Sequence, residues 1–188
     1  MTKNRFLSLA ITTSAGLLAS SCGNTSTGEN QTTSTPAPVA MADASETVGP
    51  FAVRDMGTFD EPWAGAFAPG TPVLFVTEQA GTLKFVDTNT GRMGTVSGVP
   101  EVDYGGQGGL GDIAFLPGES SSTLGNRTIY LSWAEAGDGD TRGAVVGRGQ
   151  LVCEQADACA IEGLNIIWRQ SPKVTGRGHY SHRIAFTP

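Results

Sequence analysis

Residues 75–86, Phe75-Val76-Thr77-Glu78-Gln79-Ala80-Gly81-Thr82-Leu83-Lys84-Phe85-Val86, decide the fold class. Two short runs rich in β-branched and aromatic residues flank a turn that contains Gly81, and this is the composition of a β-hairpin. Glycine suits the turn because it adopts a positive φ without steric cost. The stretch therefore predicts two antiparallel strands, Val73–Glu78 and Thr82–Asp87.

The same pattern continues along the chain from Pro62 onward. We find no amphipathic helical stretch there, and further apolar runs alternate with turns that contain glycine. Short strands with turns at nearly even spacing indicate an all-β sandwich, barrel or propeller, and four-stranded meanders are typical of propeller blades. Residues 128–133 and 145–151 are expected to pair through the loop 136–143. The other predicted strands are Gly111–Leu116, Thr128–Glu135, Ala144–Glu154, Leu164–Gln170 and His182–Phe186.

The first 22 residues have the pattern of an export signal. Lys3 and Arg5 precede an apolar run, and small residues follow up to Cys22. The run is too short to span a membrane, which takes about 20 apolar residues. Residues 18–22, Leu-Ala-Ser-Ser-Cys, resemble a bacterial lipoprotein box, in which the cysteine is acylated. We therefore expect an exported lipoprotein anchored on the periplasmic side of a membrane; a plain secreted protein with an incidental Cys22 is the alternative.

Residues 23–46 are built from Ser, Thr, Asn, Pro, Ala and Gly and contain no aromatic residue. Such a segment cannot bury enough apolar surface to offset its ordering entropy. It is predicted to be a disordered linker that holds a folded domain, residues 47–188, away from the membrane.

The charge of the chain limits the class of partner. Removal of residues 1–22 would leave ten basic and 18 acidic residues, a net charge of −8. This sign disfavours nucleic acid and anionic lipid surfaces. We expect no nucleic acid, contact with the membrane only through a lipid anchor, and a small-molecule ligand.

Cys153 and Cys159 flank five residues. In an exported protein, two cysteines at this separation predict a disulfide that closes a hairpin tip. A zinc site would need more ligands than two thiols, and no histidine lies near in sequence. Cys22 is then the unpaired cysteine, in agreement with its acylation.

Two stretches carry residues suited to chemistry. His179 and His182, the only histidines of the chain, lie within residues 178–186. Histidine has an ordinary pKa of about 6.5 and accepts a proton near neutrality, so either is a candidate base; both are otherwise ordinary loop histidines. Gln107 lies among four glycines in residues 105–109. That loop is either a plain turn or a place where the backbone approaches a ligand closely and presents one amide.

Taken in order, these pieces resemble the N-terminal part of the soluble aldose sugar dehydrogenases, the glucose/sorbosone dehydrogenase family that depends on pyrroloquinoline quinone (PQQ). The resemblance runs from about Pro62 to Phe186. It is carried by Pro62-Trp63, Ala66-Phe67, Leu74-Phe75-Val76-Thr77-Glu78, Gly81, Leu83, Gly98-Val99-Pro100, Val102, Gly106-Gln107-Gly108-Gly109-Leu110, Asn126-Arg127, Ile129-Tyr130-Leu131-Ser132, Arg148-Gly149, Leu151, Ile167, Arg169-Gln170, Pro172-Lys173, Gly178-His179 and Arg183.

The resemblance implies a six-bladed β-propeller with PQQ and calcium at the mouth of its channel, of which this chain would form about the first two blades. His179 would be the general base that takes the proton of the anomeric hydroxyl while hydride passes to the quinone. Gln107 would bind the sugar or the quinone, and Arg183 would contact the cofactor or support a strand. The product would be a lactone, and an external acceptor would take the electrons.

The chain departs from the family pattern at two places. Ser181-His182 stands where family members commonly carry small residues, so a second imidazole lies close to the proposed base. The quinone-binding cations and the calcium ligands of the family are expected beyond residue 188, so the chain resembles a truncated propeller without activity. A non-catalytic propeller that binds carbohydrate or protein is the alternative; a lactone-hydrolysing propeller would need a cluster of acids, which the sequence lacks.

Overall fold

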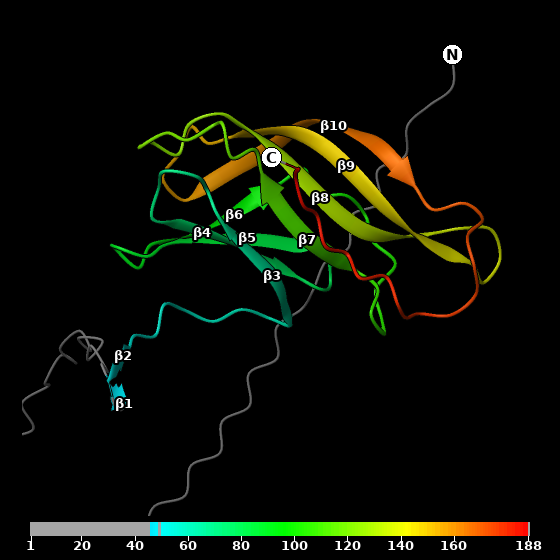
Figure 1. Ribbon diagram of the computed structural model, residues 1–188, viewed down its shortest axis with the longest axis horizontal. Coiled ribbons are helices and arrows are strands. Elements are labelled where there is room, and N and C mark those ends of the chain that lie inside the picture. Colours follow the sequence, from blue (N-terminus) through cyan, green and yellow to red (C-terminus); the bar gives the residue numbers. More distant parts are fainter. Residues whose placement is uncertain (1–45, 49, 188) are drawn as a thin grey trace, which may run out of the picture. The chain divides into compact units, whose positions relative to one another are not determined.

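The computed structural model describes residues 46–48 and 50–187, and every regular element in this part is a β-strand (Figure 1). The all-β prediction is therefore confirmed. The expected signal segment, Cys22 and almost all of the expected linker lie outside the described residues. None of the described residues belongs to a helix long and apolar enough to cross a membrane. The strands are β1 Glu46–Val48, β2 Phe51–Val53, β3 Pro62–Phe67, β4 Val73–Glu78, β5 Thr82–Asp87, β6 Met93–Ser97, β7 Leu110–Phe115, β8 Arg127–Ala136, β9 Arg142–Val152 and β10 Ala158–Arg169.

Two antiparallel meanders make up the main sheet, in the order β3-β4-β5-β6-β10-β9-β8-β7, and β1 pairs only with β2. The meanders β3–β6 and β7–β10 each have the four-stranded form of a propeller blade. Their last strands join them, because β6 and β10 pair in parallel from Thr95↔Ala158 to Ser97↔Ala160. The first strand of each meander, β3 or β7, lies at one end of this strand order, and these two strands contact each other. The two meanders confirm the prediction of about two blades of a β-propeller.

The hydrophobic core lies where the two meanders face each other. The ring of Phe75 on β4 is 5.3 Å from that of Phe85 on β5 and 5.3 Å from that of Phe115 on β7. Leu131 and Trp133 on β8 belong to the same buried cluster. Burial of large apolar side chains contributes roughly 1.5–3 kcal/mol each, so this shared core holds one meander against the other.

The hairpin that opens the sequence argument is confirmed at its predicted bounds. β4 and β5 pair from Val73↔Asp87 to Glu78↔Thr82, and Gly81 in the turn has φ +105°. The predicted pairing of residues 128–133 with 145–151 is confirmed as well, because β8 and β9 pair from Arg127↔Leu151 to Ala136↔Arg142.

Two strands were missed, and the start of a third was predicted wrongly. β3 and β6 were missed, because Pro62 and Gly94 weaken the local pattern and the strands form by pairing with β4 and β5. β10 begins at Ala158 rather than at residue 164, directly beside the disulfide between Cys153 and Cys159.

Residues 182–186, predicted as a strand, form none. His182 has φ +59°, outside the β region, and its carbonyl accepts a hydrogen bond from the Ser132 hydroxyl. The N–H of Ile184 donates to the Asp112 carboxylate instead of to a neighbouring strand. The carbonyl of His182 and the N–H of Ile184 are thus bound by side chains rather than by a neighbouring strand.

Candidate functional site

Gln107 and His179 lie next to each other, although they come from different loops. Gln107 lies in the loop between β6 and β7, and His179 lies in the segment after β10. The main-chain N–H of His179 donates a hydrogen bond of 2.5 Å to Gln107 Oε1, and both residues are exposed. The structure therefore brings together an imidazole and an amide that face solvent.

The loop that carries Gln107 is shaped by its glycines. Gly106 and Gly109 have φ values of +61° and +93°, which other residues adopt only with strain. A Cβ at Gly109 would overlap the carbonyl oxygen of Gln79. The Gln79 amide donates hydrogen bonds to the carbonyls of Gly106 at 2.7 Å and Gly108 at 2.9 Å. The glycines of this loop are thus needed for its packing against Gln79, at the β4–β5 turn.

Arg142 on β9 and Arg177 connect the loop of Gln107 to the segment that carries His179, because Arg142 pairs with Asp103 and donates to the carbonyl of Gly176. The Arg142 guanidinium lies 3.1 Å from the Asp103 carboxylate and 2.7 Å from that of Asp140. Arg177 lies 3.5 Å from Asp103 and donates to the carbonyl of Tyr104. Hydrogen bonds to Asp140 and then Asp103 raise the pKa of Arg142, so the guanidinium keeps its charge.

A second set of contacts ties residues 182–184 to β7 and β8. Ser132 Oγ donates to the carbonyl of His182 at 2.7 Å and accepts the N–H of Asp112 at 2.9 Å. Asp112 Oδ2 accepts the N–H of Ile184 at 2.7 Å. Asp112 and Ser132 are buried, so the anchor lies beneath the exposed residues and sets their place.

The two histidines differ in access to solvent. His179 is exposed, whereas His182 is only 8% exposed and burial lowers the pKa of its imidazole. A base that meets a dissolved ligand needs an accessible ring, which His179 has. This difference is not visible in the sequence, where the two histidines are three positions apart.

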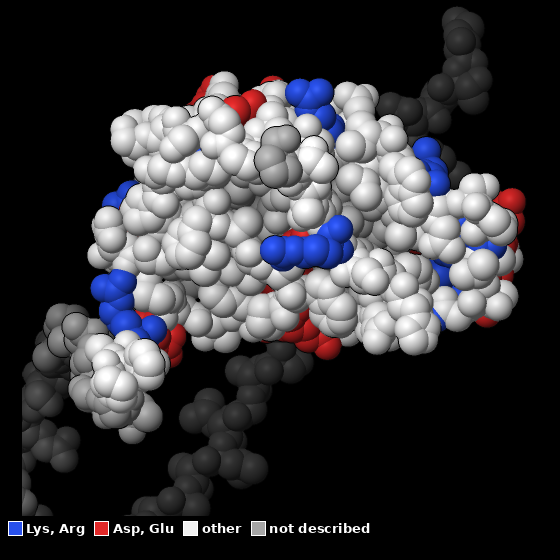
Figure 2. Space-filling model, in the orientation of Figure 1, with Lys and Arg blue, Asp and Glu red and all other residues white. Residues whose placement is uncertain are grey.

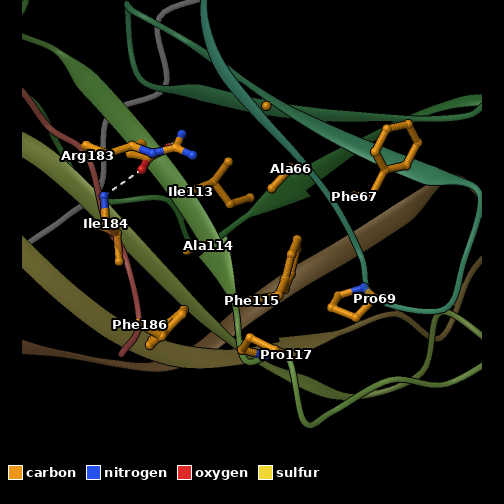
Figure 3. Close-up of a pocket in the computed structure, with 12 residues that line it drawn as sticks. Ala66, Phe67, Pro69, Ile113, Ala114, Phe115, Pro117, Arg183, Ile184 and Phe186 are labelled. Carbon is orange, nitrogen blue, oxygen red and sulfur yellow. Dashed lines mark hydrogen bonds and ion pairs between the residues drawn. The ribbon is translucent and has the colours of Figure 1, made fainter. Parts of the chain in front are cut away.

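Arg183 lies beside a groove of about 370 Å³ (Figure 3). Its side chain is 80% exposed, and its guanidinium lies 3.8 Å from Asp112 Oδ1, which has no hydrogen-bond partner among the described residues. The ring of Phe186 packs edge-on against Tyr130 at 5.1 Å. The groove runs between β3, β7 and the segment 183–186, and its lining residues are Gly65, Ala66, Phe67, Pro69, Asp112, Ile113, Ala114, Phe115, Pro117, Arg183, Ile184 and Phe186.

Three exposed polar groups lie in these segments, of which the structure brings His179 and Gln107 into contact. His179 supplies a ring nitrogen, and the Gln107 NH₂ has no partner among the described residues while its oxygen is engaged. Arg183 supplies an exposed cation suited to a carboxylate. No group of three or more His, Cys, Asp or Glu side chains that would hold a metal ion occurs in residues 46–48 and 50–187. Figure 2 shows Lys and Arg side chains separated by uncharged surface on the face in view, without a continuous basic patch among the described residues.

Sequence reasoning missed the residues that hold these groups in place, which are Gln79, Asp103, Asp112, Ser132 and Arg177. Asp103 and Asp112 lie at the two ends of the glycine-rich stretch, and this position was the one sequence signal that could have identified them. Ser132 and Arg177 gave none, because Ser132 contacts His182, 50 positions away, and Arg177 contacts Asp103, 74 positions away.

Comparison with known proteins gives consistent matches. Residues 59–188 match the family model described as Glucose / Sorbosone dehydrogenase. Aldose sugar dehydrogenase YliI of Escherichia coli (strain K12) is 35% identical over 127 residues, which are 68% of this chain and 32% of that protein.

Two solved structures have the same part of the fold. A crystal structure of glucose dehydrogenase is 35% identical with a TM-score of 0.59, and the match covers 68% of this chain and 35% of that one. The soluble aldose sugar dehydrogenase from Escherichia coli in the apo-form is 34% identical with a TM-score of 0.58, with 68% and 35% covered. This chain thus spans about a third of the length of these relatives.

Proposed function

Because this chain belongs to the glucose/sorbosone dehydrogenase family, we propose that its protein oxidises aldose sugars to lactones with PQQ as cofactor. The observation that carries the proposal is the contact between His179 and Gln107 in a chain whose relatives are named sugar dehydrogenases. An exposed base beside an exposed amide suits a sugar hydroxyl, which donates to the base and accepts from the amide.

His179 is proposed as the general base. A ring nitrogen takes the proton of the anomeric O–H as C1 loses hydride, so that the C1–O single bond becomes a carbonyl. Histidine suits this role because its pKa lies near the working pH, where base strength and the unprotonated fraction are both useful. The contact with Gln107 uses the main-chain N–H of His179 and leaves the ring available.

The residues of the site also fit the cofactor. PQQ carries carboxylates, and when bound it supplies the two-electron acceptor for the hydride. The exposed Arg183 guanidinium would pair with a carboxylate, and the Gln107 NH₂ would donate to a quinone or sugar oxygen. An external acceptor is proposed to reoxidise the cofactor.

The described residues include no cluster of metal-binding side chains that could serve as calcium ligands. We assign no residue and no step to calcium. Anchoring through Cys22 on the periplasmic side is proposed from the sequence of residues 1–22 alone.

The test is reconstitution of the complete protein with PQQ and calcium, followed by sugar-dependent reduction of a dye. We expect turnover with aldoses and none without PQQ. Residues 1–188 alone are expected to give none, because they span about a third of the relatives. Sugar binding by the complete, PQQ-loaded protein without any dye reduction would contradict the proposal and favour a carbohydrate-binding propeller.

A further inference from the structure

We propose that His182 is a positioning residue, whose neutral imidazole holds the main chain of Gln107 and thereby sets the place of His179. The inference rests on the proposed function for its catalytic consequence, because it concerns the same site. Its structural part concerns only residues of this chain.

The ring of His182 is enclosed by three neighbours. Its Nε2 lies 3.3 Å from the carbonyl oxygen of Gln107, and its centroid is 5.6 Å from that of Tyr180. Gly111 on β7 lies against the ring so closely that a Cβ at that position would overlap it. The ring therefore fills a space that β7 leaves open only because residue 111 is glycine.

The contacts select one protonation state of His182. The neighbour of Nε2 is a carbonyl, which can only accept, so Nε2 carries a hydrogen and donates it. Nδ1 is buried and has no hydrogen-bond partner among the described residues. A second proton would place a buried N–H at Nδ1 without an acceptor, which is costly. The imidazole that fits the site is therefore neutral, with its hydrogen on Nε2.

Gln107 is held at three points, and His182 supplies one of them. Its N–H donates to the carbonyl of Arg177 at 2.7 Å, and its carbonyl accepts from the His182 ring. Its side-chain oxygen accepts the N–H of His179. Loss of the ring contact would free the main chain of Gln107 to move, and the hydrogen-bonded N–H of His179 would move with it.

The charged groups around His182 offset only a small part of the effect of burial on the pKa of its imidazole. Asp112 on β7 favours the protonated ring, but burial outweighs it and the hydrogen bond to Gln107, and lowers the pKa. The other neighbours that contact it from β7 and β8, Gly111 and Ser132, are uncharged. Tyr180, whose ring centroid is 5.6 Å from that of His182, and Arg183, the next residue in the chain, are titratable groups of the same segment.

The test compares two variants of the complete protein, His182→Phe and His182→Gln. Phenylalanine keeps the ring volume and removes the donor, whereas the glutamine amide reaches the position of Nε2 and donates. Both keep a Cβ at the positive φ, so the backbone strain is matched. We expect His182→Phe to lower kcat about tenfold at nearly constant KM, and His182→Gln to stay within about threefold of the wild type.

A second measurement does not depend on enzymatic activity. Hydrogen exchange of the His179 amide, assigned in histidine-labelled protein by loss of its signal in His179→Gln, reports the bond to Gln107. Exchange should be about tenfold faster in His182→Phe and unchanged in His182→Gln. If His182→Phe does not fold, Gly111→Ala displaces the ring without removing it and should give the same readings.

Equal exchange and equal kcat in all three proteins would overturn the proposal. Equal impairment of His182→Phe and His182→Gln would also overturn it, because packing would then matter and the hydrogen bond would not. Failure of the wild type to oxidise any aldose would refute the proposed function, while amide exchange would still decide the positioning role.

Discussion

The main-chain N–H of His179 donates to the side-chain oxygen of Gln107, a residue 72 positions earlier in the chain. This bond leaves the imidazole of His179 and the amide nitrogen of Gln107 available on the same exposed edge. It also makes the place of each residue depend on the other.

Replacement of His179 by glutamine in the complete protein is expected to lower kcat by about 10²-fold to 10⁴-fold, the usual contribution of a general base. The side chain is exposed, so the folded protein should keep its melting temperature. Dye-coupled turnover and thermal unfolding measure the two effects. Glu162→Gln, an exposed substitution on β10, is the control. Wild-type turnover in His179→Gln would remove His179 from the reaction.

His182 should make stability depend on pH in a defined window. Its folded-state pKa is lowered by burial, whereas the unfolded imidazole titrates near its ordinary value of 6.5. Unfolding therefore takes up a proton between these values, and stability falls as the pH decreases below 6.5 through the folded-state pKa. His182→Gln should show a smaller loss of melting temperature from about pH 7.5 to about pH 5. Parallel curves for the two proteins would contradict the buried, neutral state.

Gly111→Ala should act on His182 from the opposite side. The added Cβ would overlap the imidazole ring, and overpacking of this kind costs about 1–3 kcal/mol of stability. Denaturant unfolding measures the loss. Gly118→Ala is the matched control, because a Cβ at Gly118 meets nothing within 4 Å. Equal effects of the two substitutions would show that the His182 ring does not occupy the space beside β7.

Reduction of the disulfide between Cys153 and Cys159 should destabilise the fold. The loop that it closes is short, so the chain-entropy contribution is about 2 kcal/mol. The melting temperature of the wild type should fall on addition of a reductant, and that of Cys153→Ser with Cys159→Ser should not change. A wild type insensitive to reductant, with free thiols confirmed by titration, would contradict this contribution.

Glu135 should contribute to stability only above acidic pH. Hydrogen bonds from Arg169, assisted by Lys173, hold the pKa of the Glu135 carboxyl below 4.5. The stabilisation is complete above that ordinary value and is lost as the pH falls through the lowered pKa of the folded protein. Glu135→Gln should cost up to about 1 kcal/mol at neutral pH and almost nothing in acid. Glu101→Gln, at an exposed position, is the control for the loss of one negative charge.

The sequence alone was sufficient for the strands with strong local signals. β4, β5 and the β8–β9 hairpin follow from β-branched and aromatic runs that flank turns, so short-range chemistry specifies them. β3 and β6 escaped notice because their residues have weak preferences and become strands only by pairing with β4 and β5. The prediction of a strand at 182–186 was wrong because long-range contacts override the local pattern. The side chains of Ser132 and Asp112 bind main-chain groups that would otherwise pair with a neighbouring strand.

For the site, the sequence by itself determined which residues are candidates, because His179, Gln107 and Arg183 stand in recognisable local patterns. Only the tertiary structure decided that His179 is exposed and His182 buried, and that Gln107 contacts both. The reason is physical. Solvent access and hydrogen-bond partners depend on which distant segments pack together, and here the packing of two meanders places residues 107 and 179 at one edge.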